Sequence, residues 1–376
     1  MTLRRRIAGA LLAICPLACA GDAPRPPDRS GTYSGTSDAS AASAAGGGMF
    51  LVADDENNAL RLYRVDRPGP PVRTVRWDAH LGLDASDSDS AEADIEGAAA
   101  LGERVYWVSS HGRNSDGEWR ASRHQFFATT IRATGREVSI KPFGRAYHDL
   151  ARDLARSPKL RGLGLAEALQ PDDRKDGDLA PKKRGLNIEA LAAGADGRSL
   201  LIGFRNPRPG GRALLVPLRN PAAVVGEGAK PAFGEAILLD LGRGSEGRHA
   251  LGIRGMVYSP RHRAYLVLAG PHDGGGPFAL YTWSGGKADR PRRLERATAA
   301  LGQVPKLTPE TLLVHPHAPR VQVLSDDGTL KVKVRSPAEC LPGTYKDGRC
   351  SAKHLLDPAR KTFRSLWVDT PSSPKG

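Results

Sequence analysis

The sequence predicts an all-β protein, a single β-propeller of about five to six blades with a short helical insertion and a disordered N-terminal leader. Three observations support this prediction. Short apolar runs separated by turn residues recur along the 376-residue chain, which contains 43 glycines and 29 prolines. A short motif with a charged third residue occurs four times, each time opening a stretch of small or apolar residues. Within each repeat the first strand contains small residues and the last strand contains polar ones. Propeller blades show the same change from the innermost to the outermost strand.

The repeated motif marks the predicted innermost strands. In its first copy, 94–98, Glu96 is followed by Gly97 and then by alanines, and small residues suit a strand crowded near a central axis. The later copies begin at Asn187, Gly252 and Thr308. We expect the third residue of each copy to face the central channel; these residues are Glu96, Glu189, Arg254 and Glu310.

Strongly apolar runs predict second strands that are buried on both faces. They lie at 49–52, 105–108, 200–202, 265–268 and 321–324. Third strands are predicted at 60–65, 126–131, 213–216, 278–283 and 330–334, and more polar fourth strands at 72–77, 138–143, 237–239, 292–294 and 363–368. The first repeat lacks an inner strand of its own in this assignment, and 362–368 is the candidate to supply it.

One long connection, 147–184, has a different composition. Residues 148–155 have helical spacing, Pro158 interrupts it, and three leucines then indicate a second short helix. We expect an insertion over one face of a propeller domain that spans 49–370, with a charged loop at 172–183. Insertions on one face of a scaffold often carry functional sites.

The N-terminus has the features of an export signal, 1–19. Three arginines precede the short apolar stretch 7–17, which is too short to cross a bilayer. Cleavage after Ala20 would give a soluble secreted or periplasmic protein, whereas lipidation of Cys19 would give an outer-membrane-anchored lipoprotein whose only membrane contact is its lipid. The segment 20–48 is rich in small and polar residues without an apolar period, which predicts a disordered tether.

Charge and cysteine content narrow the functional classes. The formal net charge is +14, but basic residues are interspersed with acids and aromatic residues make up only 6%. We therefore expect a solvated basic surface and no nucleic-acid partner. Outside the signal, only Cys340 and Cys350 remain, on either side of a turn-rich segment. In an exported protein this arrangement predicts a disulfide, since a metal site would need further ligands nearby.

Seven short segments in a fixed order carry a family resemblance. They are 94–98, 110–113, 185–189, 203–207, 252–254, 269–271 and 325–328. Together they resemble the bacterial family known as domain of unknown function 3616, which implies a propeller but no reaction. The chain is also distantly similar to exported propellers known as phytase-like esterases, which share Glu-Gly motifs.

The charged quartet has two interpretations. In the first, it is a structural ring in which Arg254 neutralises Glu96 and Glu310 while Glu189 bonds backbone amides. In the second, Glu96, Glu189 and Glu310 bind a cation, and oxygen-rich clusters of this kind suit calcium. An arginine at the same place opposes a metal, which favours the ring.

A second set of candidates follows the second strands, at the channel end where the quartet begins. It contains Asp54 and Asp55, His111 and Arg113, Arg205 and Asn206, His272 and Asp273, and Asp326 and Asp327. Arg113 and Arg205 would clamp an anion or bond loop carbonyls. His111 would act as an acid or base or cap a loop. Both sets should border one opening, as binding sites in concave pockets do.

Two functions remain open at this point. The first is binding of a small anionic or envelope ligand, or scaffolding, through the channel mouth. The alternative is a calcium-assisted hydrolase of phosphate or carboxylic esters, with Glu96, Glu189, Glu310 and Asp326 around the cation. In that case His111 serves as acid or base, and Arg113 and Arg205 hold the substrate. No Gly-x-Ser-x-Gly motif is present, which argues against a conventional serine hydrolase.

Overall fold

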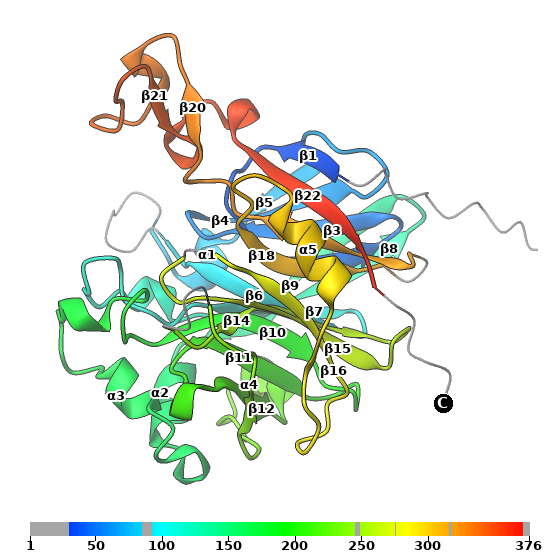
Figure 1. Ribbon diagram of the computed structural model, residues 1–376, viewed down its shortest axis with the longest axis vertical. Helices are drawn as coiled ribbons and strands as arrows, with labels where there is room; N and C mark the ends of the chain where they lie inside the picture. The colour runs from blue at the N-terminus through cyan, green and yellow to red at the C-terminus, as the bar shows by residue number, and fades with distance from the viewer. Residues whose placement is uncertain (1–29, 85–91, 245–248, 275, 316–317, 371–376) are drawn as a thin grey trace, which may run out of the picture.

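Five four-stranded antiparallel sheets make up the body of the protein in the computed structural model, which describes residues 30–84, 92–244, 249–274, 276–315 and 318–370 (Figure 1). In the first four sheets the strands are hydrogen-bonded in chain order. The first sheet contains β2 (Ala39–Gly46), β3 (Met49–Asp54), β4 (Asn57–Arg64) and β5 (Arg73–Arg76). The second contains β6 (Ile95–Leu101), β7 (Arg104–Ser109), β8 (Phe126–Thr134) and β9 (Glu137–Tyr147).

The remaining sheets follow the same plan with one exception. The third contains β10 (Asn187–Ala193), β11 (Leu200–Asn206), β12 (Ala213–Leu218) and β13 (Ile237–Leu239). The fourth contains β14 (Gly252–Ser259), β15 (Ala264–Gly270), β16 (Ala279–Trp283) and β17 (Arg292–Arg293). The fifth has the order β18 (Pro309–Val314), β19 (Arg320–Ser325), β22 (Thr362–Asp369) and β1 (Ser30–Ser34).

The five sheets are arranged in a ring. The inner strands β2, β6, β10, β14 and β18 contact one another in that order, and β18 also contacts β2. Among the described residues an apolar cluster fills each interface between neighbouring sheets, including the one between the fifth sheet and the first, where Tyr33, Phe50 and Phe363 meet. The arrangement is therefore propeller-like, and it agrees with the all-β prediction.

All five predicted second strands lie within described strands, namely β3, β7, β11, β15 and β19. Their continuous apolar runs are explained by packing on both faces, because every residue of β3, β11 and β15 is buried. The third strands were predicted correctly in the first four sheets, where they correspond to β4, β8, β12 and β16.

The predicted disorder of 20–48 is wrong for residues 30–46, which form β1 and β2. β2 is the inner strand of the first sheet, and its alanines and serines are almost all buried between β3 and the neighbouring inner strands. Small residues without an apolar period are what such a crowded position requires. Residues 20–29, like the export signal and Cys19, lie outside the described residues.

The predicted role of 362–368 as the missing inner strand is also wrong. β22 instead pairs with β19 on one side and with β1 on the other, so that the two ends of the described chain complete one sheet (Figure 1). The segment predicted as the third strand of this sheet forms β20 (Lys331–Lys333), which pairs with β21 (Arg349–Ser351) in a separate hairpin. The predicted disulfide between Cys340 and Cys350 is present and joins the connection between the two strands to β21.

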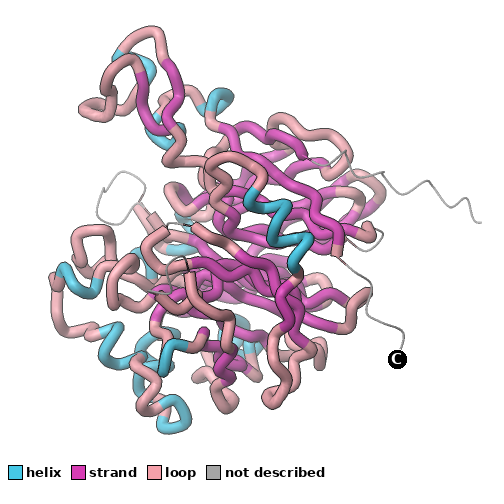
Figure 2. Tube along the Cα trace, viewed as in Figure 1, coloured by secondary structure: helices cyan, strands magenta, loops and turns pink. Residues whose placement is uncertain are grey.

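Helices lie around the strand body, and one of them crosses in front of the strands in this view (Figure 2). They are α1 (Asp78–Leu81), α2 (Leu150–Arg156), α3 (Leu165–Leu169), α4 (Pro221–Glu227) and α5 (Glu295–Gly302). Short 3-10 turns lie at Ala121–Arg123, Pro158–Leu160, Gly177–Leu179, Pro209–Gly211, Pro337–Glu339, Ala352–His354 and Pro358–Arg360. The insertion predicted at 147–184 contains α2 and α3, whose leucines pack into the apolar cluster between the second and third sheets. Within the described ranges, no helix has the length and apolar character needed to span a membrane.

Candidate functional site

A charged cavity of about 560 Å³ lies at the channel mouth. All four charged residues of the repeated motif line it, and Asp55, Arg205 and Asp326 from the ends of second strands line it as well. The structure thus brings the first set and part of the second set of sequence-predicted residues around one opening. Nine acidic and six basic side chains line the cavity in total, so its wall is polar.

A β-bulge explains why the motif residues project from their strands. In each inner strand the register to the second strand skips one residue near the start, and the skipped residues are Ser40, Glu96, Glu189, Arg254 and Glu310. The extra residue of a bulge is left out of the ladder, which lets its side chain turn away from the sheet plane. All five residues line the cavity.

Ser40 is the member of this set that sequence reasoning missed. It occupies the bulge of β2, in the segment that was expected to be disordered. The available signal was a polar residue placed two positions after an aspartate and followed by alanines, as in the motif around Glu96.

Glu189 and Arg254 form the centre of a buried ion-pair network. Arg254 Nη1 lies 3.0 Å from Glu189 Oε2, and its Nη2 pairs with Glu310. Arg205 Nη1 donates a hydrogen bond of 2.5 Å to Glu189 Oε1. All four side chains are less than a tenth exposed. Burial, together with the charge of Arg205, lowers the pKa of Arg254 to about 10.

The expected ring differs from this network in two respects. Arg254 neutralises Glu189 and Glu310 rather than Glu96 and Glu310. Glu189 is held by two arginines and by Asn187 Nδ2, at 2.8 Å, rather than by backbone amides. Glu96 has no hydrogen bond or ion pair within the described part of the chain, and burial and the charge of Asp94 raise its pKa well above the usual range.

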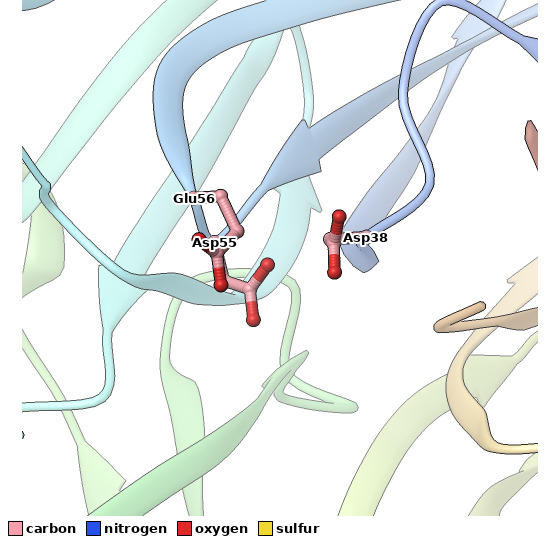
Figure 3. Close-up of side chains that lie close together, drawn as sticks. All are labelled: Asp38, Asp55 and Glu56. Carbon is pink, nitrogen blue, oxygen red and sulfur yellow. The ribbon is translucent and has the colours of Figure 1, made fainter. Parts of the chain in front are cut away.

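Carboxylates gather on the Glu96 side of the cavity. Asp38, Asp55 and Glu56 offer oxygen atoms within 4.8 Å of one another, and so do Asp55, Asp94 and Glu96. Figure 3 shows the first group on two segments, with Asp38 near the start of β2 and Asp55 and Glu56 in the turn after β3. Burial and the charges of Asp38 and Asp326 raise the pKa of Asp55 well above its usual range.

This acidic group is not the metal set that the sequence predicted. Of Glu96, Glu189 and Glu310, only Glu96 belongs to it, because the other two are neutralised by arginines. Asp55 is common to both groups of three, and its buried Oδ1 has no hydrogen-bond partner among the described residues. Several carboxylate oxygens at this spacing are the ligand type that calcium prefers.

His111 and Arg113 do not line the cavity. His111 is buried with a φ of 53°, and its Nδ1 lies 2.9 Å from the carbonyl oxygen of Ser109. Burial lowers the pKa of His111 to about 4, so its ring is neutral at pH 7. Because His111 is buried and does not contribute to the cavity wall, a ligand in the cavity would not reach it.

Arg113 donates hydrogen bonds to carbonyl oxygens of loops, which is the second of its two predicted roles. Its guanidinium donates hydrogen bonds to the carbonyl oxygens of Gly117, Gln170 and Asp173, at 3.0, 2.9 and 2.8 Å. Arg113 therefore fastens the insertion to the loop after β7. The same insertion contains Lys182, which lines the cavity.

Comparisons with known proteins add no assignment of family or activity. No protein-family model matches the chain, and no curated protein is similar to it. Among solved structures, the glutaminyl cyclase of Myxococcus xanthus is 14% identical, with a TM-score of 0.42 over 92% of this chain and 96% of that one. The β-propeller domain of Cps50 (Swd1) from Myceliophthora thermophila is 9% identical, with a TM-score of 0.35 over 90% and 99%. At these scores neither likeness carries an argument, and the description of the fold rests on the sheets themselves.

Proposed function

We propose that the protein is an exported five-bladed β-propeller that binds a small polar ligand in the channel-mouth cavity. Each four-stranded sheet would be one blade. One observation carries the proposal: all five inner strands direct the residue of an equivalent bulge, Ser40, Glu96, Glu189, Arg254 or Glu310, into the same cavity. Burying a charge is costly unless it is compensated, and Glu96, whose pKa burial raises, has no hydrogen bond or ion pair among the described residues.

The size and chemistry of the cavity support a small ligand. Its volume of about 560 Å³ is in the range of pockets that bind small molecules. A wall with nine acidic and six basic side chains offers hydrogen bonds and charge rather than apolar contact. A ligand with several polar groups fits such a wall better than an apolar one does.

The proposed location is the cell envelope or the exterior. It is supported by the basic and apolar pattern of 1–19 and by the disulfide between Cys340 and Cys350, a bond typical of oxidising compartments. The mass of the mature N-terminus separates a soluble form from one lipidated on Cys19.

A second candidate is a calcium-assisted hydrolase of phosphate or carboxylic esters. The observation that favours it is Asp55, whose buried oxygen lacks a partner and which belongs to both groups of closely spaced carboxylates. Calcium held by Asp38, Asp55, Glu56, Asp94 and Glu96 would be adjacent to the cavity and would attract an anionic ester. His111 has no part in this candidate because it does not line the cavity.

The proposal is tested by thermal unfolding of the purified protein with a panel of calcium chloride, phosphate, small organic acids and monosaccharides. At least one compound should raise the Tm. Ser115 is exposed at the rim of the cavity, and Ser115→Trp should abolish that rise by blocking access. Ser139→Trp, at an exposed position of β9, should leave it intact. A panel without any effect, or an equal response of the two variants, would contradict the proposal.

The calcium candidate has its own readout in the same experiment. Calcium chloride should raise the Tm, and Glu96→Gln should reduce the shift by removing one ligand oxygen's charge. Exposed Glu103, which pairs with Arg132 on the surface, provides the control Glu103→Gln. Hydrolysis of p-nitrophenyl phosphate that stops on addition of EGTA would establish the activity, and its absence with calcium bound would restrict the protein to binding.

A further inference from the structure

Arg205 presents unused hydrogen-bond donors to the cavity. Its side chain, at the end of β11, is only 5% exposed, and Nη1 is engaged by Glu189. The buried Nε and Nη2 have no hydrogen-bond partner among the described residues. Buried donors of a charged group are costly to leave unpaired, because they have lost their hydrogen bonds to water without replacement. The two free donors of a guanidinium form a fork that matches a carboxylate or a phosphate.

Lys182 converges on the same point from the insertion. The Nζ of Lys182 and the Nη2 of Arg205 each lie 3.7 Å from the position that a Cβ on Gly274 would occupy. Within the described ranges Lys182 has no ion pair, and the charged groups near it are Arg205, Arg254 and Lys353, with Asp326 as the one acid among them. Two neighbouring cations repel each other, and an anion placed between them reduces that repulsion.

Gly274 leaves this point free of a side chain. Its φ of +84° is a conformation that glycine adopts readily, so the backbone of the loop after β15 can pass close to both cations. Any larger residue would direct its Cβ toward the space between Arg205 and Lys182.

Asn187 adds an acceptor to the wall of the same cavity. The residue is 3% exposed, its Nδ2 donates to Glu189, and its Oδ1 has no partner in the described part of the chain. An unused acceptor suits a hydroxyl or an ammonium group of a ligand. Asp55 and Glu96 line the same cavity, and burial raises the pKa of both carboxyl groups.

We infer that the cavity holds its ligand in one orientation, with a carboxylate or phosphate between Arg205 and Lys182 and a hydroxyl or ammonium group toward Asn187. The ligand class is thus a compact anion that also carries hydrogen-bond donors. This inference rests on the proposed function and specifies which chemical group the cavity recognises.

The test uses three probes that share a carbon skeleton: glycerol, glycerate and glycerol 3-phosphate. Isothermal titration calorimetry on the full chain should detect binding of at least one of the two anions and no binding of glycerol. The anion that binds with the higher affinity shows whether the site between Arg205 and Lys182 prefers a carboxylate or a phosphate. Equal affinity for glycerol and the anions, or no binding of either anion, would overturn the inference.

Three substitutions test whether the anion binds between Arg205 and Lys182. Lys182→Met should weaken anion binding about tenfold, in line with the loss of one charge-assisted hydrogen bond. Lys183→Met removes the neighbouring exposed lysine, which lies 3.8 Å from Asp178, and should leave the affinity unchanged. Arg205→Lys keeps the charge beside Glu189 but loses the fork, and should weaken binding further than Lys182→Met.

Failure of this inference is distinguishable from failure of the proposed function. If Lys182→Met binds the anions as the wild type does while Ser115→Trp still blocks them, the cavity binds ligands but the anion subsite lies elsewhere. If Ser115→Trp also leaves binding intact, the cavity is not the binding site and both proposals fall. Circular dichroism of each variant establishes that the fold is retained.

Discussion

At the scale of single residues, the role of each charged side chain at a β-bulge depends on whether an oppositely charged side chain pairs with it. Glu189 and Glu96 occupy equivalent positions in neighbouring inner strands. Glu189 lies between Arg205 and Arg254, whereas Glu96 has no such partner among the described residues. One position therefore stabilises the ring, and the other leaves a carboxylate for a ligand.

This difference predicts opposite effects of the same substitution. Glu189→Gln leaves two buried arginines without their shared carboxylate and should lower the free energy of unfolding by about 3–5 kcal/mol, the usual cost of breaking a buried pair. Glu96→Gln removes a carboxylate that burial and Asp94 disfavour, and should be neutral or stabilising. Urea denaturation at pH 7 measures both values. Equal destabilisation by the two substitutions would contradict the division of roles.

The buried histidine His111 predicts a pH dependence of stability. Burial lowers its pKa from 6.5 to about 4 in the folded chain, and neighbouring His124 is shifted in the same direction. Because the unfolded chain binds the proton more tightly, the stabilisation is complete above about pH 6.5 and is lost as the pH falls through about 4. A shift of this size corresponds to about 3 kcal/mol for His111.

The measurement is urea denaturation at several pH values between 4 and 7. His111→Asn should flatten the loss of stability on acidification, since asparagine does not titrate and tolerates the positive φ of this position. A substituted protein with the same pH profile as the wild type would show that the proton is taken up elsewhere.

At the scale of elements, apolar runs were the most informative part of the sequence. Runs such as 265–268 predicted second strands correctly because a strand buried on both faces must be apolar throughout. β2 was missed for the opposite reason. Its alanines and serines pack in a crowded centre, and a small polar strand of that kind has the same composition as a disordered tether.

The candidate site was predictable in part at this scale. The repeat of a charged residue before small residues identified Glu96, Glu189, Arg254 and Glu310, because an identical bulge requires the same local pattern in each strand. The pairing of their charges was not predictable, since it depends on the angle between neighbouring strands. Lys182 and Asp38 were missed because a loop and a strand start without the motif bring them to the cavity.

At the scale of the whole molecule, the ring is completed by the two ends of the described chain. β1 and β22 lie side by side in the fifth sheet (Figure 1), although more than 300 residues separate them in the sequence. Pairing over such a distance leaves no local pattern, which is why the repeat predicted the sheets but not how the ring closes. The closed ring in turn keeps five bulges directed at one cavity.

A crystal structure of the protein grown with glycerol 3-phosphate would show directly whether this cavity is a ligand site. We expect electron density for the phosphate between Arg205 and Lys182, with the glycerol hydroxyls toward Asn187. The same crystals of the Lys182→Met variant should show weaker density at that position. A fully ordered ligand bound outside the cavity, with none inside it, would contradict the account.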